Sequence, residues 1–109
     1  MTRFLIGDFE RDVLLAIHHL RGTGYAVTIS DEIAKRIGKS PSLGAIYVTL
    51  DRLQKKGFVS SKLGEATPER GGKRKRHYRI EAPGVRALSE SKAAAEKMWA
   101  NIPPLVGRA

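Results

Sequence analysis

The sequence contains no cysteine, and this absence excludes several kinds of protein at once. A chain without thiols has no disulfide framework, no thiol redox sensor, no cysteine-type zinc site and no iron–sulfur cluster. Its apolar runs are only a few residues long, far short of the roughly 20 that a membrane-spanning helix needs. The first residues, MTRFLIGDFERD, reach acidic side chains too early for a signal peptide. We therefore expect a cytoplasmic protein with no membrane partner.

Acidic and aromatic residues are scarce. The chain has 11 Asp and Glu against 20 Lys and Arg, a net charge of +9, and only 6% aromatic residues. The segment from Arg52 to Arg79 holds ten of the cations, at positions 52, 55, 56, 62, 70, 73, 74, 75, 76 and 79, and only two acids. Such a cluster attracts polyanions. An RNA or single-strand binder is disfavoured, because few aromatic rings are present to stack on bases.

The spacing of apolar residues predicts three helices in the first half of the chain. The first covers residues 4–20, where Phe9, Val13 and Ile17 recur at helical spacing. The second covers residues 28–37, with Thr28 at its capping position. Its buried stripe is expected to be Ile29, Ile33 and Ile37.

The third helix is expected to begin with Ser40 as N-cap and Pro41 in the first turn, and to run to Lys56. Its inward stripe consists of Leu43, Ile46, Leu50 and Leu53. Steps of about 100° per residue turn five other residues away from that stripe: Gly44, Ala45, Val48, Arg52 and Lys55. Lys55 and Lys56, near the helix end, are expected to be solvated.

After Gly57 the apolar period changes from 3.6 to 2, which predicts a β-hairpin. Its strands lie in FVSSKL and RHYRI, and the basic stretch GEATPERGGKRK forms an extended tip between them. A phosphate-cradling nucleotide loop is disfavoured, because a strand rather than a helix follows Gly71 and Gly72. A solvated basic tail is the other alternative, and the alternation of Tyr78 and Ile80 argues against it.

A last helix is expected to begin after Ala82, with Pro83 in its first turn, and to end at Pro103 and Pro104. A heptad-like seam runs along it, interrupted by Lys92. Its apolar members, which we predict to form a dimer interface, are Val85, Leu88, Ala95, Trp99 and Ile102. A short chain gains from covering such a seam with a second copy.

The order helix, helix, helix, hairpin, helix predicts an α+β, mainly α fold, a winged helix-turn-helix with a C-terminal dimerisation helix. Residues 1–81 would form the DNA-binding domain, and residues 82–109 the dimerisation helix and a short tail. In this arrangement the third helix enters the major groove and the hairpin, or wing, reaches an adjacent groove or the backbone. The cations fall on these two elements.

Two stretches, SLGAIYVTLDRLQKKGFV and LGEATPERGGKRKRHYRI, resemble the PadR family of bacterial transcriptional regulators. Members carry a Gly-x-Leu/Ile-Tyr-x-x-Leu-x-x-Leu-x-x-x-Gly helix and a wing of Gly-Gly, basic residues and an aromatic-Arg-Leu/Ile strand. The opening LIGDFERDVLLAI is similar as well. The resemblance implies a dimeric DNA-binding repressor. The chain departs from it at His77, where the family often has Tyr, and at EAPG, which replaces Thr-x-x-Gly.

The residues expected to contact DNA lie on the third helix and the wing: Ser42, Gly44, Ala45, Tyr47, Val48, Thr49, Arg52, Lys73, Arg74 and Arg76. Arg52 could bind a guanine edge or a phosphate, and Val48 could meet a thymine methyl group. The resemblance suggests backbone contacts for Ser42 and Tyr47. Alternatively, Tyr47 packs at the core margin and Thr49 is an ordinary surface residue.

Nothing in the sequence supports catalysis or a cofactor, and we expect no enzyme. His18 and His19 are adjacent on a helix and point about 100° apart, which disfavours a metal site. The expected partners are double-stranded DNA and a second copy of the chain, with a small-molecule effector near Trp99 as a further partner that the resemblance allows. The alternative function is a winged-helix module whose basic face meets an acidic protein instead of DNA.

Overall fold

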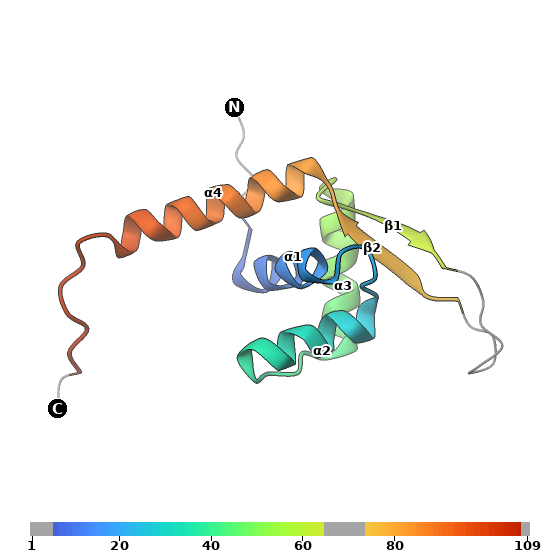
Figure 1. The fold of residues 1–109 in the computed structure, drawn as a ribbon, viewed down its shortest axis with the longest axis horizontal. Coiled ribbons are helices and arrows are strands. Elements are labelled where there is room, and N and C mark those ends of the chain that lie inside the picture. The colour runs from blue at the N-terminus through green and yellow to red at the C-terminus, as the bar shows by residue number, and fades with distance from the viewer. Residues whose placement is uncertain (1–5, 65–73, 108–109) are drawn as a thin grey trace.

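The computed structural model describes residues 6–64 and 74–107. The elements follow the predicted order (Figure 1): α1 (Asp8–Leu20), α2 (Ala26–Ile37), α3 (Leu43–Lys55), β1 (Val59–Leu63), β2 (Arg76–Ile80) and α4 (Ala82–Trp99). Four helices and one antiparallel two-stranded sheet in this part of the chain confirm the α+β, mainly α prediction.

The core lies where α1, α2 and α3 meet. The predicted stripes supply most of it, and its largest fully buried side chains are Leu14, Ile17, Ile29, Ile46, Leu50, Leu53 and Val13. Two predicted members are wrong: Ile37 is 56% exposed and Leu43 is 43% exposed. Both are terminal residues of their helices, Ile37 the last of α2 and Leu43 the first of α3, where the chain diverges from the bundle.

Helices α1, α2 and α3 begin at other residues than predicted: α1 begins at Asp8, with Gly7 as its N-cap, and not at residue 4. Local hydrogen bonds explain the shifts of α2 and α3. In α2 the N-cap is Tyr25, and Thr28 is the third helical residue, whose hydroxyl accepts the Tyr25 N–H at 3.0 Å. In α3 the N-cap is Ser42, whose hydroxyl accepts the Ala45 N–H at 3.1 Å. The predicted cap, Ser40, lies outside the helix, because the Pro41 carbonyl after it accepts a hydrogen bond from Ser30 of α2.

The hairpin of β1 and β2 packs on the core through one of its two faces. The register pairs Val59 with Ile80 and Ser61 with Tyr78, so these four side chains share that face. Tyr78 is buried there, and its N–H donates to the Gly24 carbonyl at 2.9 Å. The turn between α1 and α2 thereby extends the sheet by one bridge, which anchors the hairpin to the helices.

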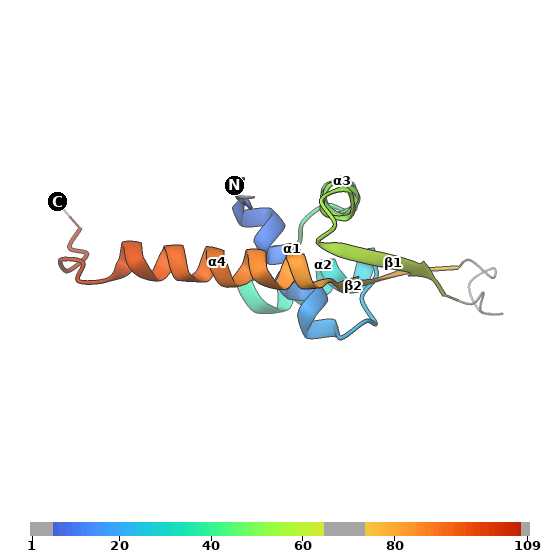
Figure 2. The same cartoon turned by 90° about the horizontal axis from the view of Figure 1, so that it is seen from above.

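Helix α4 leaves the sheet directly and touches the body through its first turns only. Gly84 and Ala87 are buried there, whereas the later turns project away from the three-helix body (Figures 1 and 2). The radius of gyration is accordingly 16.5 Å, against about 13 Å for a compact chain of this length.

The end of α4 differs from the prediction. The helix stops at Trp99, and Asn101 adopts a left-handed conformation with φ of 56°. Ile102, predicted as part of the helical seam, therefore lies beyond the helix. Within the described ranges, no helix is long and apolar enough to cross a membrane.

Candidate nucleic-acid interface

The face of α3 that points away from the core is open to solvent. All five residues predicted for this outward face are exposed: Gly44, Ala45, Val48, Arg52 and Lys55. Val48 is 59% exposed although it is apolar, and a side chain built at Gly44 would meet nothing within 4 Å. The outward face of α3 therefore presents the apolar side chain of Val48 beside the Arg52 guanidinium. At Gly44 it leaves space for a partner to approach closely.

The amino-terminal end of α3 is also open. Ser42 caps it by accepting the Ala45 N–H, which leaves the N–H groups of Leu43 and Gly44 without a hydrogen bond inside the described part of the chain. Free N–H groups at the positive end of a helix dipole favour an anion such as a phosphate.

Thr49 does not belong to this face. It is only 4% exposed, which corrects the expectation that it lies at the surface, as a DNA contact or otherwise. Thr49 follows Ile46 by three residues and precedes Leu53 by four, and this spacing puts it on the inward stripe.

A second stripe of α3, formed by Tyr47, Asp51 and Gln54, faces the hairpin. Burial raises the pKa of the Tyr78 phenol above its usual value, and the nearby Arg76 guanidinium acts in the opposite direction. Tyr47 and Asp51 also raise the pKa of this phenol, which places both of them close to the sheet. Tyr47 is 57% exposed, so its side chain is open to solvent.

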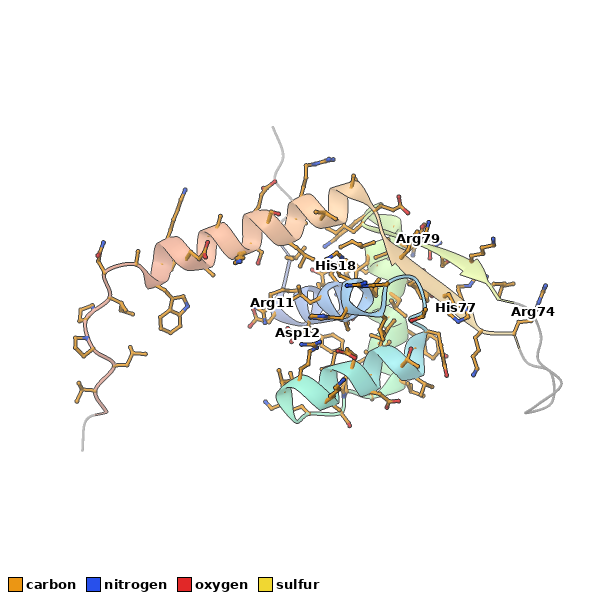
Figure 3. All side chains as sticks on the ribbon, viewed as in Figure 1. Arg11, Asp12, His18, Arg74, His77 and Arg79 are labelled. Carbon is orange, nitrogen blue, oxygen red and sulfur yellow. The ribbon has the colours of Figure 1, made fainter. Side chains whose placement is uncertain are left out.

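One hydrogen bond joins α3 to the hairpin directly, and a second continues from it across the two strands. Arg76 Nη1 donates to Ser61 Oγ at 3.0 Å, and Ser61 Oγ donates to Gln54 Oε1 at 3.0 Å. The base of the wing therefore lies beside the last turn of α3. Figure 3 shows Arg74, which is exposed, at the outer end of the described hairpin. The predicted contact Lys73, together with Gly71 and Gly72, lies outside the described residues.

The other face of β2 carries a different set of contacts that the sequence did not indicate. Lys75 Nζ donates to the Tyr25 hydroxyl at 3.2 Å and lies 4.4 Å from the centre of its ring. The His77 ring meets the same tyrosine edge-on, at 5.6 Å between ring centroids. Lys75 is thus held against the start of α2. The alternation of side chains along β2 was the available signal that Lys75 and Arg76 point to opposite faces.

The two lysines at the end of α3 differ from each other. Lys55 is solvated and pairs with Asp51 at 3.0 Å, one helical turn away. Lys56 bonds to Glu10 of α1 at 2.9 Å, with the two side chains 25% and 10% exposed, so the expectation of a solvated Lys56 is wrong.

The bond to Lys56 changes the pKa of the Glu10 carboxyl group. Burial alone raises the pKa of its carboxyl group, but the hydrogen bonds from Lys56 and from the Gly7 N–H outweigh burial and lower the pKa below its usual value. The Lys56 charge is therefore paired with a carboxylate of the protein itself. Arg52, by contrast, makes no ion pair within the described residues, and its guanidinium is free to bind a partner at the surface.

The predicted dimer residues on α4 are largely open. Val85 is 45% exposed, Trp99 is 59% exposed and Ala95 is exposed, whereas Leu88 is partly buried against the core. An open groove of about 450 Å³ runs between α1 and α4, and its apolar lining includes Leu15 of α1 with Val85, Leu88 and Ala95. No described part of the chain covers this groove.

The two adjacent histidines point to different places. His18 lines the groove between α1 and α4, and His19 Nδ1 lies 3.1 Å from Arg36 Nη2 on the α2 side. In the part of the chain that the structure describes, no three His, Asp or Glu side chains gather as a metal site would require.

Comparisons with known proteins agree with this fold. The family model described as the transcriptional regulator PadR-like family matches residues 13–90. A solved PadR-like transcriptional regulator from Bacillus cereus is 26% identical, with a TM-score of 0.66, over 83% of this chain and 82% of its own. A PadR family transcriptional regulator from Eggerthella lenta is 24% identical, with a TM-score of 0.67, over 84% and 79%. No curated protein matches the chain significantly.

Proposed function

The chain belongs to the PadR-like family of transcriptional regulators, and from this membership we propose that it binds one double-stranded DNA sequence as a homodimer and represses transcription there. Membership and the winged helix-turn-helix fold support DNA binding and regulation. Repression, the dimer and the symmetry of the DNA site are the parts that we add. We propose a cytoplasmic location, in keeping with a regulator of this family.

The observation that carries the proposal is the continuity between α3 and the wing. Beside the exposed face of α3, the stripe that contains Gln54 faces the hairpin, and hydrogen bonds join Gln54 to Ser61 of β1 and Ser61 to Arg76 of β2. A duplex lying on this surface would meet a helix for its major groove and a cationic hairpin for the neighbouring backbone or minor groove. An arginine is well suited to a narrow minor groove, where the negative potential is enhanced.

Within this surface we assign two kinds of contact. Ser42, Tyr47 and the free N–H groups at the start of α3 would bind phosphates, together with the wing cations Lys73, Arg74 and Arg76. Gly44, Ala45, Val48 and Arg52 would approach base edges, with the Arg52 fork suited to guanine. The burial of Thr49 excludes it from either set.

The dimer is supported by the uncovered groove between α1 and α4. Residues 1–81 would form the DNA-binding domain, and residues 82–109 would supply the dimerisation helix and tail. A two-fold axis through α4 presents two copies of α3, so the preferred DNA site should be an inverted repeat. A small-molecule effector near Trp99 is a further partner suggested by the resemblance, and its chemistry is left open.

Selection of bound sequences from a random duplex pool tests this function. We expect an enriched inverted repeat. The selected duplex should bind more weakly as salt rises, by a factor of about 10³–10⁵ between 50 and 200 mM if the dimer makes about 6–10 phosphate contacts. Failure to bind any duplex would reject the proposal and favour a module that meets an acidic protein.

Two sets of variants separate the assigned roles. Replacing Arg74 and Arg76 with Ala should weaken binding to all sequences alike and reduce the dependence on salt. Replacing Arg52 with Ala should instead cost about 1–3 kcal/mol on the preferred sequence and relax the choice of base at one position. Unchanged affinity in the Arg74 and Arg76 variant would remove the wing from the interface.

A further inference from the structure

The Arg76 side chain is exposed, yet its guanidinium is held by a neighbour. Its Nη1 donates to the Ser61 hydroxyl, which in turn reaches the amide oxygen of Gln54, both at 3.0 Å. The three residues come from three elements: Gln54 from the last turn of α3, Ser61 from the middle of β1 and Arg76 from the first position of β2.

The chemistry of these groups permits one arrangement of protons. A guanidinium can only donate, so the Ser61 oxygen accepts from Arg76. The hydroxyl has one hydrogen of its own, and the Gln54 amide oxygen can only accept, so that hydrogen goes to Gln54. Ser61 therefore donates its one hydrogen to Gln54 and accepts from Arg76, and its hydroxyl links the arginine of the wing to the end of α3.

The strand register explains why Ser61 can do this and its neighbour cannot. Ser61 lies opposite Tyr78, and Arg76 lies two residues before Tyr78, so Ser61 and Arg76 are diagonal neighbours on one face of the hairpin. Ser60 points to the opposite face, where its hydroxyl donates to Glu81 Oε2. Of the two adjacent serines, Ser61 thus binds a cation, Arg76, and Ser60 binds a carboxylate, Glu81.

We propose that Ser61 and Gln54 are positioning residues for DNA binding, which hold the Arg76 guanidinium beside α3 before the duplex arrives. An arginine loses much rotamer freedom when it is fixed in one position. If the two hydrogen bonds have already restricted it, less freedom is lost on binding, and the affinity is higher. This inference rests on the proposed function and goes beyond it, because neither Ser61 nor Gln54 needs to touch DNA.

Four single substitutions and one double variant test the role of the hydroxyl. Ser61→Val and Ser61→Thr have nearly the same shape, suit a β-strand equally, and differ in the hydroxyl. Ser60→Val makes the same change on the opposite face. Arg76→Ala, alone and combined with Ser61→Val, measures whether Ser61 acts through the arginine. The readouts are the dissociation constant for the selected duplex at several salt concentrations and the thermal unfolding of each variant.

We expect Ser61→Val to weaken binding by about three- to tenfold, the effect of one or two hydrogen bonds, and Ser61→Thr to bind as the wild type does. Ser60→Val should bind as the wild type does as well. Arg76→Ala should weaken binding and reduce the salt dependence by about one phosphate contact. In the Arg76→Ala background, Ser61→Val should have no further effect.

Each contrary result has its own meaning. An equal loss from Ser61→Val with and without Arg76 would overturn the positioning role, and so would equal losses from Ser61→Val and Ser61→Thr. Normal DNA binding by Arg76→Ala would overturn it too, because no contact would be left to position. Absence of DNA binding in the wild type would overturn the proposed function itself, and the inference with it.

Discussion

Gly44 lies on the outward face of α3, and a methyl group added there would meet no described atom within 4 Å beyond its chain neighbours and the backbone of its own helix. Alanine is favoured over glycine inside helices by about 0.5–1 kcal/mol. We predict that Gly44→Ala leaves the protein as stable as before or slightly more stable. The same variant should bind DNA about fivefold more weakly or worse, because the methyl group occupies space that a phosphate or base edge needs.

Gly107→Ala is the matched control for this variant. The space around Gly107 is equally open, but this residue lies in the tail beyond α4. Thermal unfolding and duplex titration of both variants check the prediction. If Gly44→Ala binds DNA as tightly as Gly107→Ala does, the first turn of α3 does not approach the duplex closely.

At the scale of single residues, the sequence predicts exposure on α3 correctly for the residues that take no part in the core. The exposure of Gly44, Val48 and Arg52 follows from the helical period and the position of the apolar stripe. Thr49 was expected at the surface, but it shares the helical spacing of the inward stripe and is buried. Lys56 was missed because its partner Glu10 is 46 residues away in the chain.

Between elements, α4 lies very close to the start of the hairpin. A methyl group on Gly84 would lie 2.4 Å from the Phe58 carbonyl oxygen and 2.9 Å from Ile80 Cγ1. We predict that Gly84→Ala destabilises the protein by about 1–3 kcal/mol, because α4 must shift away from the backbone. Urea denaturation checks this, with Gly44→Ala as the variant that adds the same group in open space. Equal stability of the two variants would contradict the prediction.

The bond between Lys56 and Glu10 joins the end of α3 to the start of α1, and its contribution depends on pH. The folded protein lowers the pKa of Glu10 below its usual 4.5. Such a carboxyl group stabilises the fold above pH 4.5, and this stabilisation is lost as pH falls through the lowered pKa. We predict that Lys56→Met costs about 1.5–3 kcal/mol at pH 7, as expected for a hydrogen bond to a charged group.

The free-energy cost of Lys56→Met should be smaller at pH values well below 4.5, because Glu10 is then protonated in both the folded and the unfolded state. Urea denaturation at pH 7 and at acidic pH measures the difference. Lys55→Met serves as the control, because its exposed pair with Asp51 should contribute only about 0.3–0.5 kcal/mol. A cost of Lys56→Met that does not change with pH would contradict the assignment of this cost to the bond with Glu10.

For the whole molecule, the decisive feature is that α4 and the hairpin both extend from the three-helix body (Figures 1 and 2). The outer half of α4 leaves Met98 81% exposed and Trp99 59% exposed. We predict a dimer at tens of micromolar in analytical ultracentrifugation. Because Trp99 is the single tryptophan of the chain, its fluorescence should shift to longer wavelength as the dimer is diluted into monomers.

Trp99→Ala should weaken this dimer by about 30-fold or more, as a buried aromatic anchor does at an interface. Met98→Ala is the control, since Met98 is adjacent on α4 but lies off the predicted seam. Trp99→Ala should also weaken binding to an inverted repeat, because the two half-sites are no longer held together. A monomeric wild-type protein, or equal effects of the two substitutions, would reject the seam as the interface.

The amino-acid sequence by itself determined the order of the elements, the two strands and the exposed side of α3. Periodicity, turn residues and the positions of charges are local properties of the sequence, and they do not depend on how distant parts of the chain pack together. Only the tertiary structure decided that Lys56 pairs with Glu10 and that Ser61 holds Arg76. Each of these depends on groups from separate elements meeting at hydrogen-bond or packing distance. The relative placement of those elements is determined by burial of the whole core, and no local sequence pattern encodes that placement.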